Sequence, residues 1–359
     1  MTRWERRSAA LAFGSALSVV LAEALLRSSF LPWPLALANY MASCYEADSP
    51  RAILYTDPRL RLRIERPTWD AACGFNRRTW RHHSDRLGAR GEGDSDRADV
   101  VLLGDSMVYG QGVEETDTAA HALAGVLGKR VANLGTSGGS PVEYVWQAMN
   151  LVPEMRPKVA VVFLYRNDFG EILDERSAAE LRTFVESGAG PEANVIPATH
   201  RFEGAPARGS WLARAASSSF VFRAVRFCWL TRNGALRAPN RRRHAVDLGL
   251  GTQYVHASMK RIRDFLAESG AKLVVAYMPA DAVPNSGGER MGRRMRRVSA
   301  EVAMELGVPY FDPTGSVTLA DGRPDPAAFL AGDWHLSPEG NLRIARALAD
   351  FITRERLFE

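Results

Sequence analysis

The chain has 359 residues, of which 46% are hydrophobic and 24% are charged, and its formal net charge is +5 at pH 7. This composition is typical of a globular protein and excludes a disordered chain, a collagen-like chain and a multi-span membrane protein. Three cysteines are too few for a disulfide-stapled miniprotein or a four-cysteine zinc module. The basic clusters lack interleaved aromatic residues, so no nucleic-acid partner is predicted.

The N-terminus carries an apolar run from about residue 9 to 26, preceded by Arg3, Arg6 and Arg7. Its length and flanking charges predict a signal anchor or transmembrane helix over residues 1–27, with the body facing the periplasm or cell exterior. Two alternatives stay open: a signal peptide cleaved at a small-x-small site, and an amphipathic helix packed on the domain with Glu23 facing water. Export would allow Cys44 to pair with Cys73.

Residues 28–98 show no long periodic run and predict an extended lead-in packed on the domain. Five short apolar runs follow, of the kind that form strands buried on both faces of a parallel sheet: 100–103, 131–134, 159–164, 272–277 and 308–311. Helical patterns alternate with them: 118–127, 141–155, 252–268, 290–306 and 341–354. Residues 99–359 are therefore predicted to form a flavodoxin-like three-layer α/β sandwich, a five-stranded parallel sheet with helices on both faces.

One segment, at about residues 170–250, breaks this alternation and predicts an insertion. It is rich in Gly, Pro, Ala and Arg, and a structureless loop of that length is unusual in a compact domain. A helix is expected near residues 210–230. The insertion is either a lid over the site or a surface decoration.

Polar residues suited to nucleophilic catalysis stand where the predicted strands end. Ser106 follows the first strand, and a nucleophilic serine needs a base and a group that orients the base. His335 and Asp333 occupy the loop before the last helix. Oxyanion donors are available in the Gly-rich turn at 135–139 and at Asn167. Each feature alone is an ordinary turn, but all of them are expected on one edge of one sheet.

These four blocks resemble the SGNH or GDSL-type serine hydrolase superfamily, in particular the subset with an N-terminal membrane anchor. The blocks read VVLLGDSMVYGQGV, VANLGTSGGS, VVFLYRND and GDWHLSPEG, and the resemblance covers about residues 99–350 apart from the insertion. It implies no metal or organic cofactor. It implies that Ser106 is the nucleophile and His335 the base, with Gly138 ahead of Gly135 as the oxyanion glycine. Ser106 itself and Asn167 are the other implied oxyanion donors.

Two positions depart from the family pattern. Tyr165 stands where the third block usually has Gly, which predicts a narrower pocket. Gly332 stands where the last block usually has Asp, three residues before the histidine. Asp333, at two residues before His335, is the orienting acid that this sequence offers, and this spacing resembles the alginate-type O-acetyltransferases. Some family members work with a Ser-His dyad instead.

The function that the resemblance implies is an extracytoplasmic serine esterase. It would remove acetyl or other short acyl esters from a cell-surface glycan or lipid. Two alternatives remain. One is an O-acyltransferase that modifies an exported polysaccharide, with a membrane protein as acyl donor. The other is a catalytically silent binding domain. A dinucleotide-binding enzyme is disfavoured because no Gly-x-Gly-x-x-Gly follows the first strand.

Overall fold

The fold is known from a computed structural model that describes residues 2–27, 34–45, 52–57, 60–93, 95–170, 176–202, 219–233, 248–279 and 289–359. Its centre is a five-stranded sheet of order β6-β5-β7-β8-β9 in which every neighbouring pair is parallel. The strands are β5 (Val100–Gly104), β6 (Val131–Gly135), β7 (Val159–Leu164), β8 (Lys272–Tyr277) and β9 (Tyr310–Phe311). The predicted parallel α/β sheet is confirmed. Every residue of β5 and β7 is buried, as their unbroken apolar sequences require.

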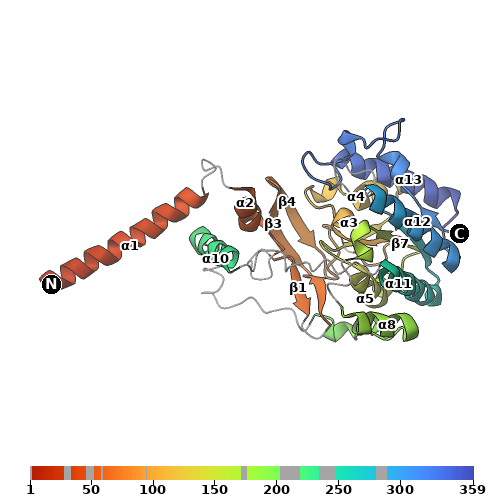
Figure 1. The fold of residues 1–359 in the computed structure, drawn as a ribbon, viewed down its shortest axis with the longest axis horizontal. Helices are drawn as coiled ribbons and strands as arrows, with labels where there is room; N and C mark the ends of the chain where they lie inside the picture. The colour runs from red at the N-terminus through yellow and green to blue at the C-terminus, as the bar shows by residue number, and fades with distance from the viewer. Residues whose placement is uncertain are drawn as a thin grey trace.

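Helices lie on both sides of this sheet (Figure 1). The longer ones are α4 (Ala119–Leu127), α5 (Pro141–Asn150), α11 (Leu248–Glu268), α12 (Glu289–Leu306) and α13 (Pro338–Arg354). Helices α4 and α13 pack together, while α11 packs against α5, α12 and α8 (Ala178–Ser187). Short helices are α3 (Ser106–Tyr109), α6 (Val152–Met155), η1 (Glu115–Asp117), η2 (Arg166–Phe169), η3 (Pro191–Ala193), η4 (Ala198–His200), η6 (Thr314–Ser316) and η7 (Pro326–Ala328).

The lead-in contains more regular structure than its sequence predicts. Helix α2 (Leu35–Ala42) is followed by two antiparallel hairpins, β1 (Leu54–Asp57) with β2 (Leu62–Glu65) and β3 (Trp69–Phe75) with β4 (Arg78–Ser84). A disulfide between Cys44 and Cys73 joins the end of α2 to β3. These strands were not predicted from the sequence, because they are short and because polar residues, including several arginines, interrupt their apolar positions.

Helix α1 (Arg3–Arg27) extends away from the rest of the molecule, with α2 and α10 (Phe220–Arg232) near its C-terminal end (Figure 1). The most apolar stretch of 18 residues within Arg6–Arg27 has a mean hydropathy of 2.0 and is not buried in the protein, which is consistent with a membrane anchor or a signal sequence. Near its C-terminal end, α1 contacts the start of α10 through Glu23. Of the helix expected at 210–230, α10 covers the second half, and residues 210–218 lie outside the described residues.

Candidate active site

Ser106 is the first residue of α3, directly after the central strand β5. The Asp105 carboxylate caps the helix by accepting the Met107 N–H at 2.9 Å. The turn is tight because two strand-ending glycines leave room for α3. A Cβ on Gly135 would lie 2.1 Å from the backbone nitrogen of Tyr109, and a Cβ on Gly104 would lie 2.4 Å from Val108. These glycines therefore allow α3 to pack directly on the sheet edge with its serine at the rim.

The structure brings His335 and Asp333 to this serine. His335 Nε2 lies 2.9 Å from Ser106 Oγ, and His335 Nδ1 lies 2.7 Å from Asp333 Oδ1. The side chains of His335 and Asp333 are only 3% and 2% exposed. The Phe75 ring stands edge-on to the imidazole at 6.3 Å, and the half-exposed Trp334 ring lies 5.5 Å from it. Both ring nitrogens of His335 thus have a polar partner, and neighbouring rings restrict its orientation.

A glycine turn explains how an acid two residues before the histidine reaches it. The Asp333 N–H donates to the Leu330 carbonyl at 2.9 Å, and Gly332 between them has φ 73°, a conformation that favours glycine. The chain then returns, so that the Leu330 N–H donates to the His335 carbonyl at 2.9 Å. The position where the family usually has Asp is therefore a turn glycine here, and Asp333 supplies the carboxylate.

The second carboxylate oxygen of Asp333 accepts a hydrogen bond from Asn76, a residue of the lead-in that the sequence analysis did not identify. Asn76, in the turn between β3 and β4, donates from Nδ2 to Asp333 Oδ2 at 2.8 Å. Asn39 of α2 holds Asn76 in turn: its Oδ1 accepts the Asn76 N–H at 2.8 Å and its Nδ2 donates to Asn76 Oδ1 at 3.1 Å. Burial raises the pKa of Asp333, but the hydrogen bonds and charge of His335 and the Asn76 amide lower it to about 2.

The predicted oxyanion donors flank Ser106 on the two strands next to β5. Gly138 follows β6 and has φ 70°, while Asn167 lies in η2 directly after β7. Within the described residues, the N–H groups of Ser106 and Gly138 meet no hydrogen-bond acceptor. The N–H of Gly135, the second choice, is already bound to Asn133 Oδ1 at 2.9 Å. The Gly135 N–H is therefore already occupied, which leaves Gly138 as the stronger candidate of the two glycines.

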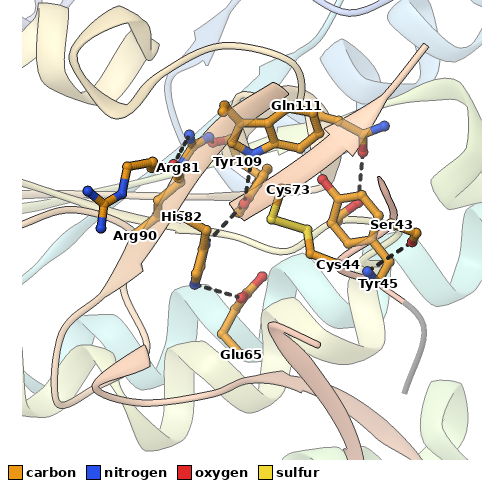
Figure 2. Close-up of a disulfide and its surroundings, with 12 residues drawn as sticks. Ser43, Cys44, Tyr45, Glu65, Cys73, Arg81, His82, Arg90, Tyr109 and Gln111 are labelled. Carbon is orange, nitrogen blue, oxygen red and sulfur yellow. Dashed lines mark hydrogen bonds and ion pairs between the residues drawn. A yellow bond between two sulfur atoms is a disulfide. The ribbon is translucent and has the colours of Figure 1, made fainter. Parts of the chain in front are cut away.

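The lead-in also supports α3 from behind. Arg90 donates to three carbonyls around the end of α3, at 2.6 Å to Tyr109, 2.8 Å to Gly110 and 2.7 Å to Val113. The Tyr109 hydroxyl lies 3.3 Å from Trp80 Nε1 and 3.0 Å from His82 Nδ1. Figure 2 shows this network beside the Cys44–Cys73 disulfide. The helix that carries Ser106 is therefore fixed by side chains from a segment that precedes the sheet in sequence.

Burial shifts the pKa of two titratable groups of this network toward their neutral forms. Burial, with the charge of Arg90 beside it, lowers the pKa of His82 to about 3. Burial raises the pKa of Glu65 well above its ordinary value, although Arg90 opposes the shift. His82 Nε2 and Glu65 Oε2 lie 4.0 Å apart (Figure 2). At neutral pH the His82 imidazole is therefore expected to be neutral, and burial favours the protonated form of the Glu65 carboxyl.

No metal centre is evident at the site. Among the residues that the structure describes, no group of three or more His, Cys, Asp or Glu side chains is arranged to hold a metal ion. The chemistry of the site derived below uses side chains and backbone N–H groups only.

The chain belongs to the GDSL-like lipase/acylhydrolase family, because the profile of that family matches residues 102–343, more than half of the sequence. It is therefore an enzyme that acts on ester bonds. The matched range includes Ser106, Gly138, Asn167, Asp333 and His335.

The solved structures with a similar fold include a lipase and two esterases. A GDSL-like lipase from Bacteroides thetaiotaomicron is 11% identical with a TM-score of 0.40, and the match covers 74% of this chain and 92% of the lipase. The aryl esterase of M. smegmatis is 16% identical, TM-score 0.39, with 72% and 99% covered. A catalytic mutant of an acetylxylan esterase from Geobacillus stearothermophilus is 13% identical, TM-score 0.40, with 71% and 94% covered. These scores are below 0.5, so the family assignment rests on the profile match. Comparison with the curated proteins finds no match.

Proposed function

We propose that this protein is a membrane-anchored, extracytoplasmic serine esterase with Ser106 as nucleophile, His335 as general base and Asp333 as the acid that orients the base. The observation that carries the proposal is the continuous series of contacts from Ser106 Oγ to His335 Nε2 at 2.9 Å and from His335 Nδ1 to Asp333 Oδ1 at 2.7 Å. This is the arrangement in which a serine hydroxyl can lose its proton as it attacks a carbonyl.

The reaction follows from these positions. His335 Nε2 takes the hydroxyl proton while Ser106 Oγ attacks the ester carbonyl carbon. The pKa of about 2 keeps Asp333 ionised at neutral pH, so its charge stabilises the imidazolium that forms. His335 then gives the proton to the leaving alcohol, and water, activated by the same base, releases the acid from the acyl-serine. The N–H groups of Ser106 and Gly138 and the Asn167 amide are proposed to bind the oxyanion, each donor contributing about 10²–10³ in rate.

The exported location is supported by two features. The disulfide between Cys44 and Cys73 is of a kind that persists in oxidising compartments outside the cytoplasm. The basic residues in the first turns of α1, Arg3, Arg6 and Arg7, favour a cytoplasmic N-terminus, which leaves the body outside. Glu23, the middle residue of the small-x-small site Ala22-Glu23-Ala24, binds the start of α10, and this contact favours an anchor that is retained.

The substrate is proposed to carry a short acyl group, such as acetyl, on a cell-surface glycan or lipid. Tyr165, which stands directly after β7 where the family usually has glycine, is only 5% exposed. A bulky buried side chain at that position leaves less room for a long acyl chain.

The test uses the full chain in detergent micelles with p-nitrophenyl acetate. Ser106→Ala is expected to lose at least about 10³ of the wild-type rate, because removal of one triad member disables the whole unit. The matched control is Ser187→Ala, the same change at the exposed end of α8, which should keep the wild-type rate. A Ser106→Ala variant that hydrolyses the ester normally would refute the proposal. Comparing acetyl with octanoyl esters tests the acyl preference separately.

A further inference from the structure

Helix α10 keeps an apolar face exposed in the described structure. Phe222, Val225 and Trp229 are 46%, 65% and 61% exposed, and their spacing of three and four residues places them on one side of the helix. The opposite side is packed: the Arg223 guanidinium is buried and donates to the Tyr40 carbonyl of α2. Large exposed apolar patches on soluble surfaces usually mark an interaction site.

The start of α10 is bound to the C-terminal end of α1. The Glu23 carboxylate accepts the Phe220 N–H at 2.9 Å, the Val221 N–H at 3.0 Å and the Ser219 hydroxyl at 3.0 Å. Arg27, one turn further along α1, pairs with the same carboxylate and lies 4.7 Å from the centre of the Phe220 ring. The one charge within the apolar run is thus fully engaged by α10 and Arg27, which explains how it is tolerated there.

We propose that α10 lies along the surface of the phospholipid bilayer, with the face formed by Phe222, Val225 and Trp229 inserted at the boundary between headgroups and acyl chains. The proposal rests on the membrane anchor proposed above. The 22 residues of Arg6–Arg27 span about 33 Å as a helix, close to the hydrocarbon thickness of about 30 Å. Glu23 lies about one turn from the end of this span, so α10 begins at the level of the membrane–water interface.

The composition of α10 suits that depth. Interfacial helices combine an apolar face containing Trp or Phe with basic residues at the edge of the face. Arg226 and Arg232 supply that charge on α10 and would lie near anionic headgroups. At about 20 Å, its 13 residues are too short to cross a bilayer but long enough to lie on one.

This contact would also hold the active site near the bilayer. Tyr40, which packs against Phe227 of α10 with ring centroids 5.4 Å apart, is adjacent in α2 to Asn39. Asn39 holds Asn76, and Asn76 binds Asp333. The membrane-facing helices and the catalytic acid are therefore linked through α2, which favours substrates close to the membrane surface.

The experiment places a nitroxide on Cys228, an exposed residue beside Trp229 and the one free cysteine of the chain. The full chain is reconstituted in vesicles of phosphatidylcholine and phosphatidylglycerol, and relaxation of the label by oxygen and by a water-soluble nickel chelate is compared. The control carries Cys228→Ser and Met304→Cys, a site that is 74% exposed on α12. The oxygen-to-nickel ratio is expected to be roughly tenfold higher at position 228, equivalent to about 1.4 kcal/mol of relative partitioning.

Equal ratios at the two positions would overturn the proposal, because α10 would then face water. Sedimentation of the same vesicles tests the anchor, and hydrolysis of p-nitrophenyl acetate tests the esterase, so failure of the α10 contact can be distinguished from failure of the anchor and of the esterase. A chain that does not sediment with vesicles overturns both the anchor and the α10 contact. Glu23→Ala, which leaves the apolar span intact, is expected to lower the ratio at position 228, and an unchanged ratio would refute the part assigned to Glu23.

Discussion

Replacing Asn76 by glycine measures what the lead-in contributes to catalysis. The Asn76 amide donates to Asp333 at 2.8 Å, and the Asp333 side chain is only 2% exposed. The backbone at Asn76 has φ 49°, a conformation that glycine adopts without strain. Asn76→Gly therefore removes the hydrogen bond to the acid while leaving the hairpin turn able to form.

The expected effect follows from the strength of that hydrogen bond. A hydrogen bond to a charged group contributes about 1.5–3 kcal/mol, and about 1.4 kcal/mol corresponds to a tenfold change in rate. If the loss falls on the transition state, kcat decreases by roughly 10- to 100-fold. KM should change little, because Asp333 faces His335 and not the substrate. Losing a donor destabilises the carboxylate, so the pKa of Asp333 should rise from about 2.

The assay records kcat and KM for p-nitrophenyl acetate between pH 4 and 8, together with the melting temperature of the full chain. The matched control is Arg77→Gly, the other residue of the same turn, which is exposed and has φ 62°. A wild-type kcat in Asn76→Gly would refute the reasoning. An equal loss in Arg77→Gly would assign the effect to the turn and not to the hydrogen bond.

Three further predictions concern stability. Reducing the Cys44–Cys73 disulfide, whose cysteines are 29 residues apart, should lower the free energy of unfolding by about 3–4 kcal/mol, and an unchanged urea midpoint would contradict this. Because burial raises the pKa of Glu65, wild type should lose stability relative to Glu65→Gln as the pH rises above 4.5, by up to about 1.4 kcal/mol per pH unit. Thermal melts from pH 5 to 8 check this, and a Gln variant less stable than wild type at pH 7 would indicate an ionised Glu65. Gly135→Ala should prevent folding, because its methyl would lie 2.1 Å from the α3 backbone. Gly125→Ala, with open space around it, should fold normally, and circular dichroism distinguishes the two outcomes.

The sheet was predictable because its strands are buried on both faces. Such strands are nearly continuous apolar runs, and their order with the helices leaves few topologies. The same reasoning placed Ser106, Gly138 and Asn167 on one edge, since the carboxyl ends of parallel strands meet there. This reasoning did not predict that the lead-in contacts α3 and Asp333, because short hairpins rich in arginine carry a weak periodic signal. The sequence around Asn76 is typical of a two-residue hairpin turn, but such a pattern does not reveal that the side chain binds Asp333.

The sequence by itself therefore determined the fold class and the types of reacting group, because apolar periodicity and strand-end position are local properties. Only the tertiary structure decided which groups meet. The bond between Asn76 and Asp333 joins residues 257 positions apart, and the Gly332 turn that brings Asp333 to His335 depends on backbone conformation. Hydrogen bonds of about 3 Å require a fully formed fold, and no local pattern encodes such distances.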